Sequence, residues 1–135
     1  MAVTYLLDTH VFLWLVSAPE RVPARELLRL PGTRLLVSSV SAMEVATKVR
    51  LGKLREGVPL ANESTWYEAL CTMRADELPI STRHSLLAGG MDWGHKDPFD
   101  RLLAAQAIIE EVPLMTADQA FTGLDGLMTF WRPES

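Results

Sequence analysis

The segment 95–107, with the sequence HKDPFDRLLAAQA, constrains the fold more than any other part of the chain. Asp97 followed by Pro98 predicts a helix start: the carboxylate can accept from free backbone N–H groups, and proline gives up a donor that would otherwise be orphaned. Beyond this start, largely apolar side chains surround most of the helix, namely Leu102, Leu103, Ala105, Gln106, Ile108 and Ile109. Such a helix is buried between other elements, so only its first turn, which carries Asp100, is left to face solvent.

Short apolar runs alternate with helical segments along the whole chain. We expect strands at residues 3–7, 34–38, 112–115 and 127–131, with a very short one at 78–80. The helices that we expect lie at 11–16, 23–30, 39–48, 63–74 and 82–87, and from 98 to 109. This alternation indicates an α/β fold with a mainly parallel central sheet of about four to five strands, flanked by helices.

Length and composition set further limits. At 135 residues, the chain is expected to form one domain over residues 1–135. The single cysteine, Cys71, excludes an internal disulfide and a cysteine metal cluster, and we expect it to be a buried small hydrophobic residue in a helix. The apolar N-terminal run has no cationic leader and is interrupted by Asp8 and His10, which predicts neither a signal peptide nor a membrane span. We therefore expect a soluble protein of the cytoplasm.

Acidic residues follow the predicted strands at the points where the strands end. Asp8 closes the first strand, Glu44 lies in the first turns after the second, and Asp118 follows the strand at 112–115 by three residues. In open parallel sheets, binding sites form at the carboxyl ends of the strands. Asp100, at the start of the central helix, would face the same edge, so four carboxylates are expected to converge there.

Each of these acids also has a purely structural explanation. Asp8 and Asp118 could cap the helices that follow them, and Asp97 is well placed as a cap. Ser41 and Glu44 have the S-x-x-E spacing of a capping box. Separate caps need not come to one edge of a sheet, however, and several uncompensated carboxylates repel one another unless a cation joins them.

Oxygen ligands without cysteine or paired histidine favour Mg²⁺ or Mn²⁺ over Zn²⁺. Such ions in an acidic cleft activate water against phosphodiesters. The formal net charge of −4 argues against a nucleic-acid binder that works by bulk electrostatics, although cations held by the acids would make the working surface less negative.

Four motifs together resemble a known family. They are LLDTHVFLWL at 6–15, SSVSAMEVATKVRLGKL at 38–54, HKDPFDRLLAAQA at 95–107, and LMTAD at 114–118. In these motifs, which span nearly the whole chain, the sequence is similar to the PIN-domain ribonucleases and most closely to the VapC-type toxins of bacterial and archaeal toxin–antitoxin pairs. The segment 91–93 departs from the pattern, since many relatives have a Leu-Pro step there.

The resemblance implies a PIN-like three-layer sandwich and a metal-dependent endoribonuclease that uses Mg²⁺ or Mn²⁺ to activate water. The implied partners are an RNA substrate, a cognate antitoxin and a second copy of the chain as a homodimer, with no membrane. The implied catalytic and metal-binding residues are Asp8, Glu44, Asp100 and Asp118, supported by Asp97, Thr9 and Thr116.

Basic residues lie at and after the end of the helix expected at 39–48, and also within the 95–107 motif. We expect them to hold RNA phosphates beside the acids: Lys48, Arg50, Lys53, Arg55, Lys96 and Arg101. The first four could equally be a solvated helix end that balances the helix dipole, and Arg101 could pair with a site carboxylate. The aromatic residues Phe12, Trp14 and Trp66 are either core residues or part of a dimer interface or antitoxin groove.

Two other functions compete with the nuclease. One is a catalytically inactive PIN-fold binding module, which the complete acidic set disfavours. The other is a receiver-like or phosphotransfer domain, which also gathers acids at strand ends. That class is disfavoured because Asp8 has no second aspartate two residues on and no acidic pair precedes the first strand.

Overall fold

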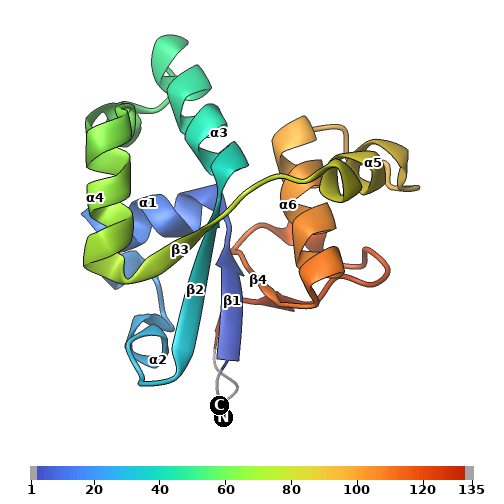
Figure 1. Cartoon of the computed structure of the whole chain (residues 1–135), viewed down its shortest axis with the longest axis horizontal. Coiled ribbons are helices and arrows are strands. Elements are labelled where there is room, and N and C mark those ends of the chain that lie inside the picture. The colour runs from blue at the N-terminus through green and yellow to red at the C-terminus, as the bar shows by residue number, and fades with distance from the viewer. Residues whose placement is uncertain (1–2, 133–135) are drawn as a thin grey trace.

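A parallel sheet of five strands forms the centre of the molecule in the computed structural model, which describes residues 3–132. The strands are β1 (Val3–Leu7), β2 (Thr33–Ser38), β3 (Ala75–Leu78), β4 (Leu114–Met115) and β5 (Thr129–Phe130). They lie in the order β3-β2-β1-β4-β5, and each neighbouring pair is parallel (Figure 1). The predicted α/β fold with a mainly parallel sheet is confirmed.

The predicted short strand at 78–80 is wrong in its position. The strand begins at Ala75, directly after Arg74 ends the preceding helix in a left-handed conformation, and Pro79 follows its last residue. Its central residues, Asp76 and Glu77, are polar and exposed because β3 is an edge strand. An edge strand of this kind lacks the apolar run that marks a buried strand, so the hydrophobic pattern did not locate it.

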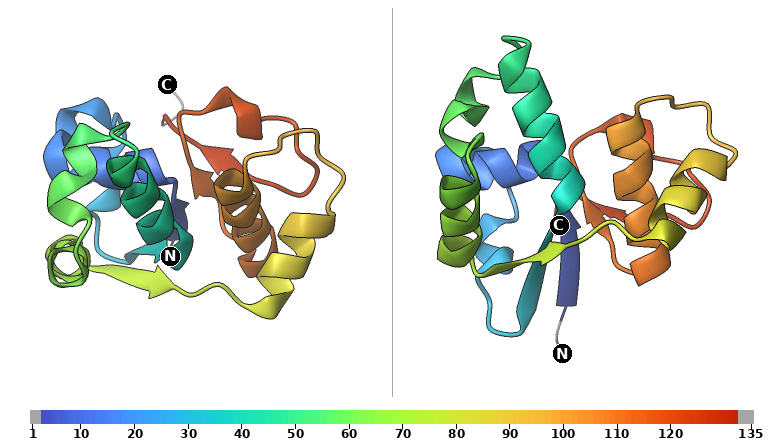
Figure 2. Two further views of the ribbon diagram at one scale, coloured as in Figure 1. Left: turned by 90° about the horizontal axis from the view of Figure 1, so that it is seen from above. Right: turned by 45° about the horizontal axis from the view of Figure 1, so that its top comes forward.

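Helices cover both faces of the sheet (Figure 2). On one face lie α1 (Thr9–Ser17), α2 (Arg25–Leu28) and α4 (Glu63–Met73), packed against Tyr5 and Leu7 of β1. On the other lies α6 (Pro98–Glu110), packed against Leu6, with α5 (Thr82–Gly90) alongside it. The alternation of β1 side chains between the two cores follows from the two-residue repeat of a strand.

The remaining elements are α3 (Ser39–Arg50), which continues directly from β2, and three short 3₁₀ turns. The turns are η1 (Pro19–Arg21), η2 (Arg55–Leu60) and η3 (Gln119–Phe121). The helix predicted at 23–30 is shorter than expected, since α2 begins at Arg25 and ends at Leu28. Within residues 3–132, no helix has both the length and the apolar character needed to cross a membrane.

Two predictions about single side chains have different outcomes. Phe12 and Trp66 are core residues, buried in van der Waals contact with ring centroids 4.9 Å apart, whereas Trp14 is half-buried and lies under the Arg21 guanidinium. Cys71 was predicted to be buried, and this is wrong: it is exposed on α4. The core-facing positions of α4 are Trp66 and Leu70, and Cys71 points away from them.

The strand order has a direct consequence for the location of a site. From β1, the chain first builds outward through β2 and β3, then returns to the other side of β1 to form β4 and β5. In open parallel sheets, ligands bind at the carboxyl ends of the strands where the order reverses in this way. Here that point lies between β1 and β4.

Candidate active site

Asp8 is the first residue after β1 and lies at this reversal point. Its extended backbone places it at the cap position of α1, but its side chain makes no capping hydrogen bond. Instead, Oδ2 accepts from the Thr116 hydroxyl, which follows β4, at 2.7 Å, and the side chain is buried. The helix-cap explanation of Asp8 is therefore wrong, because the carboxylate is turned toward β4.

Glu44 lies on the buried side of α3. Ser38, not Ser41, caps this helix by accepting from the backbone N–H of Val40, so the predicted capping box is wrong. The Ser41 hydroxyl lies 2.8 Å from that of Thr9 and ties α3 to α1. Glu44 is thus free of any capping role and is only 3% exposed.

The two oxygens of the Glu44 carboxylate have different surroundings. Oε2 accepts from the Lys48 ammonium, one helical turn later, at 2.6 Å. Oε1 is buried and has no hydrogen-bond partner among the described residues. An orphaned buried oxygen of this kind is costly, and in native structures it commonly marks a missing water or ion.

Asp97 and Asp100 divide two roles at the start of α6. Asp97 caps the helix, since its Oδ1 accepts from the backbone N–H groups of Phe99 and Asp100 at 2.8 and 3.2 Å. Asp100, in the first turn, is left free of capping and lies 2.6 Å from Nε2 of His95. The predicted cap role of Asp97 is confirmed, and the Asp100 carboxylate, which does not cap the helix, is turned toward His95.

Asp118 lies in the loop after β4 and is exposed. Its backbone N–H donates to the Thr116 hydroxyl at 3.0 Å, and its Oδ1 caps η3 through the N–H of Ala120. Thr116 therefore links Asp8 and Asp118. These two acids line one pocket of about 250 Å³, together with His10, Val11, Trp14 and Ala117.

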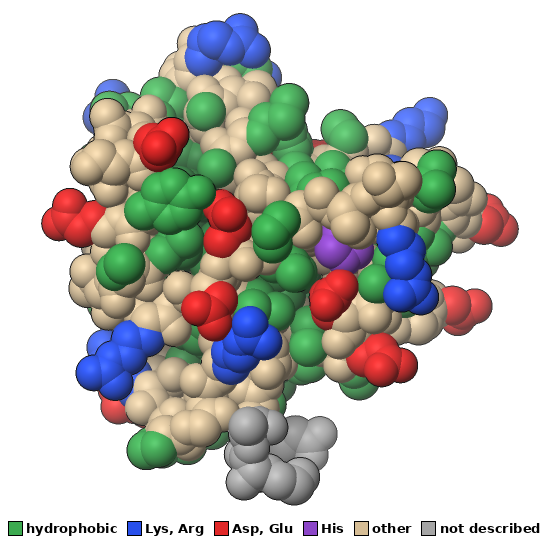
Figure 3. All heavy atoms as spheres, viewed as in Figure 1, with side chains coloured by type: hydrophobic (Ala, Val, Ile, Leu, Met, Phe, Trp, Pro, Cys, Tyr) green, Lys and Arg blue, Asp and Glu red, His purple; other side chains and the backbone are tan. Residues whose placement is uncertain are grey.

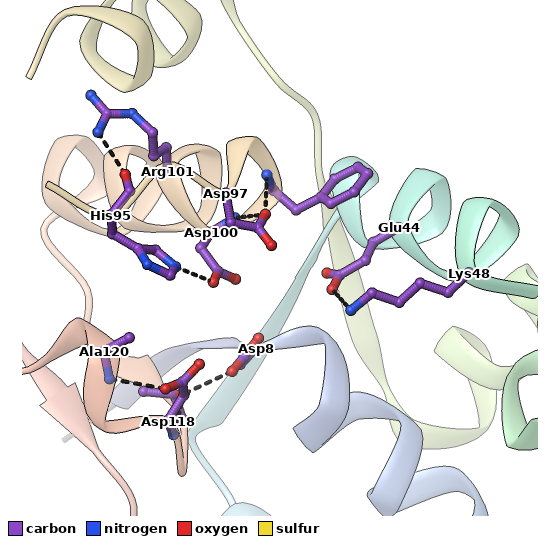
Figure 4. A network of polar contacts seen from close by, with 11 residues as sticks. Asp8, Glu44, Lys48, His95, Asp97, Asp100, Arg101, Asp118 and Ala120 are labelled. Atoms are coloured by element: carbon purple, nitrogen blue, oxygen red, sulfur yellow. Dashed lines mark hydrogen bonds and ion pairs between the residues drawn. The ribbon is translucent and has the colours of Figure 1, made fainter. Parts of the chain in front are cut away.

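The five carboxylates face a common space (Figure 4). Burial raises the pKa of Asp8, and the Glu44 carboxylate raises it further, against the hydrogen bond from Thr116. Burial also raises the pKa of Asp100, to about 6, and the negative charges of Asp97, Asp8 and Glu44 add to the effect while the His95 hydrogen bond opposes it. Groups that shift one another's pKa values in this way share one electrostatic environment.

A hard divalent cation fits this set of donors chemically. All five side chains offer oxygen, and one buried oxygen lacks a partner among the described residues. Burial, and to a lesser extent repulsion by neighbouring carboxylates, raises the pKa values of Asp8 and Asp100. Among residues 3–132, however, no three such side chains stand close enough together to hold an ion as they are arranged. Binding would therefore require some of the carboxylates to adjust.

Comparison with known proteins identifies the family. A model of the PIN domain matches residues 5–127, which is most of the chain. The chain belongs to the PIN domain family. No curated protein matches it in sequence.

Solved structures share the PIN fold over nearly the whole chain. VapBC2 from Rickettsia felis, bound to a promoter DNA fragment, is 22% identical with a TM-score of 0.65, covering 95% of this chain and 98% of that one. A toxin–antitoxin complex from Klebsiella pneumoniae is 20% identical with a TM-score of 0.66, covering 96% and 99%. DNA-bound VapBC from Salmonella typhimurium is 21% identical with a TM-score of 0.66, covering 95% and 97%.

The predicted RNA-contacting residues have different surroundings in this PIN domain. Arg50, Lys53, Arg55 and Lys96 are exposed. Figure 3 shows basic side chains at the upper end of the molecule, over the end of α3. Lys48 is instead drawn into the acidic cluster: burial lowers its pKa, but the Glu44 hydrogen bond and the charges of Glu44, Asp97 and Asp100 raise it overall.

Arg101 does not fit the predicted contact with RNA or with a site carboxylate. Its guanidinium donates to four backbone carbonyls, those of Ala88, Met91, Trp93 and His95, at 2.7 to 2.9 Å. This leaves the side chain committed to the loop between α5 and α6. The sequence predicted either an RNA contact or a pair with a site carboxylate for Arg101, because a sequence does not show which carbonyls a loop turns inward.

His95 is the site residue that sequence reasoning missed. In the sequence it is only the first residue of the 95–107 motif and was given no role, yet its ring contacts Asp100 directly. The signal was present in the motif, since a histidine five residues before an acid of the first turn can fold back onto it. The position of the loop decides whether it does so.

Proposed function

We propose that this PIN domain is a metal-dependent endoribonuclease and the toxin of a type II toxin–antitoxin pair. The observation that carries the proposal is the convergence of Asp8, Glu44, Asp100 and Asp118 at the strand-order reversal. These acids come from four separate parts of the chain, and capping does not explain the positions of the first three.

The proposed ion is Mg²⁺ or Mn²⁺, held by Asp8, Glu44, Asp100 and Asp118. When bound, it would activate water and stabilise charge on the scissile phosphate. Thr116 holds the Asp8 carboxylate in place, and Thr9 fixes α1 against α3 through Ser41. Asp97 supports the site by starting α6 and by adding negative charge beside Asp100.

The chain's own cations would serve the RNA backbone. Lys48 lies beside the acids, 2.6 Å from Glu44, and its ammonium is the one best placed to meet a phosphate at the reacting centre. Arg50, Lys53, Arg55 and Lys96 are exposed and would hold phosphates farther along the strand. Contacts of this kind position RNA without reading its sequence.

The toxin assignment is supported by the fold neighbours, which are VapBC or toxin–antitoxin complexes. Each neighbour is matched over at least 97% of its own chain, so the similarity extends over nearly all of one chain of each complex. We therefore propose a cognate antitoxin as partner, a homodimer as the working form, and the cytoplasm, where RNA substrates are found, as its place of action.

Cleavage of labelled RNA by the purified chain tests the nuclease. The wild type should cleave internally in Mg²⁺ or Mn²⁺ and not in EDTA, and Asp100→Asn should be inactive under all conditions. A chain that folds, binds RNA and never cleaves would instead be an inactive PIN-fold binding module. Cleavage by wild type and Asp100→Asn alike would point to a contaminating nuclease and count against the proposal.

A separate experiment tests the proposal that the chain is a toxin. A reading frame next to this gene that encodes a small DNA-binding protein should, when co-expressed, form a complex with the chain and suppress its cleavage of RNA. If the chain cleaves RNA but no such adjacent reading frame exists, the nuclease proposal would stand and the toxin proposal would be rejected.

A further inference from the structure

His95 touches a proposed metal ligand through one atom. Its Nε2 lies 2.6 Å from Oδ2 of Asp100, and no hydrogen bond within residues 3–132 reaches the other oxygen, Oδ1. When Asp100 is ionised, it can only accept, so the proton of this pair lies on Nε2. The hydrogen bond thus distinguishes the two oxygens of the carboxylate.

The imidazole ring is held in place by two aromatic neighbours. Trp93 lies with its ring centroid 4.9 Å from that of His95, and Phe121 lies 6.4 Å away in an edge-on arrangement. Trp93 and Phe121 also contact each other, at 5.8 Å. Phe121 ends η3, the turn that Asp118 caps, so the same aromatic group joins the segments that carry two of the acids.

The backbone around His95 is fixed by Arg101. The loop between α5 and α6 has no regular secondary structure, and four of the inward-turned carbonyls at or near it accept from this one guanidinium. Two of these carbonyls belong to Trp93 and His95 themselves. Because Arg101 directly follows Asp100, the helical turn that presents the carboxylate also fixes the loop that presents its partner.

We propose that His95 is a positioning residue that orients the Asp100 carboxylate for the cation. Its N–H engages Oδ2 and leaves Oδ1 directed into the acidic cluster (Figure 4). This inference rests on the proposed metal site. Outer-shell hydrogen bonds to metal ligands orient them, and losing one typically weakens metal binding by about 10- to 100-fold.

Mn²⁺ affinity, measured as free Mn²⁺ by electron paramagnetic resonance, tests this role without depending on activity. His95→Gln keeps an N–H close to the place of Nε2, while His95→Leu removes it but keeps apolar contact with Trp93 and Phe121. His95→Phe also lacks the N–H and keeps an aromatic ring, so it repeats the comparison if the leucine variant does not fold. Melting temperatures of all variants in EDTA show whether each variant is folded.

Positioning and packing predict opposite orders of affinity. We expect His95→Gln to bind Mn²⁺ within a few-fold of wild type, and His95→Leu and His95→Phe to bind it about 10- to 100-fold more weakly. If the apolar variants bind as well as His95→Gln, or better, His95 only packs and the inference is overturned. If wild type itself binds no Mn²⁺, the proposed metal site fails and the inference falls with it.

Discussion

At the scale of single residues, the surroundings of Asp8 predict the effect of removing its charge. Its carboxylate is buried, accepts from Thr116 and is repelled by Glu44. Asp8→Asn keeps the shape and an acceptor for Thr116 but removes the charge. Its melting temperature in EDTA should therefore be unchanged or raised, because repulsion is relieved.

RNA cleavage by Asp8→Asn should fall by more than about 100-fold, because losing a ligand should cost more than losing an outer hydrogen bond. The two measurements are made on the same preparation. A variant that cleaves at the wild-type rate would show that Asp8 has no part in the reaction.

The different hydrogen bonds of Asp97 and Asp100 predict different effects of substitution. Asp97→Ser keeps a capping oxygen for Phe99 and Asp100, so stability and most of the activity should remain, whereas Asp97→Ala should cost about 1 kcal/mol of unfolding free energy. Asp100→Asn should lose cleavage. Urea unfolding and RNA cleavage measure both effects, and the opposite result, an inactive serine variant beside an active asparagine variant, would mean that the ligand is Asp97.

The raised pKa of Asp100 predicts how stability in EDTA depends on pH. An acid whose pKa rises from 3.8 unfolded to about 6 folded binds more protons in the folded state between these values, so unfolding free energy falls as pH rises through that window. The full shift corresponds to about 3 kcal/mol. Asp8 acts in the same direction.

Urea unfolding in EDTA from pH 4 to pH 7 measures this dependence. Asp100→Asn should flatten the decline and should be more stable than wild type at pH 7, since its amide can still accept from His95. A profile identical in slope to that of the wild type would show that the pKa of Asp100 is not raised in the folded protein.

At the scale of elements, the loop between α5 and α6 depends on Arg101. Arg101→Lys cannot reproduce bonds to four carbonyls and should lower the unfolding free energy by about 2 to 4 kcal/mol. Lys96→Ala is the matched control: this exposed cation should leave stability unchanged and weaken RNA binding. If Arg101→Lys is as stable as wild type and only RNA binding suffers, Arg101 contacts RNA as the sequence first indicated.

The sequence predicts best those elements whose buried positions form a recognisable pattern of apolar residues. β1 and β2 are apolar runs, and Asp97 followed by Pro98 marks the start of α6. β3 was misplaced because an edge strand needs no apolar run. The capping box at Ser41 was wrong because two caps were possible in sequence, and the tertiary bond to Thr9 decided between them.

At the scale of the molecule, the site depends on distant parts of the chain meeting. Asp8 and Thr116 are hydrogen-bonded although 108 positions separate them. The rule that parallel strands place their carboxyl ends at one edge predicts this meeting, so the sequence could predict that the acids lie near one another. The partners of Lys48, His95 and Arg101 were not, because they depend on loop paths and side-chain packing that no periodicity records.

The acids are proposed to form one divalent-cation site, and a cation that binds only the folded state must raise its stability. The most direct measurement is therefore the melting temperature in saturating Mg²⁺ or Mn²⁺ compared with EDTA. A millimolar site gives about 1 to 2 kcal/mol, or roughly a few degrees for a domain of this size. Wild type should show this shift, and a variant carrying both Asp100→Asn and Asp118→Asn should show none. A double variant with the full wild-type shift would place the metal elsewhere and contradict the account.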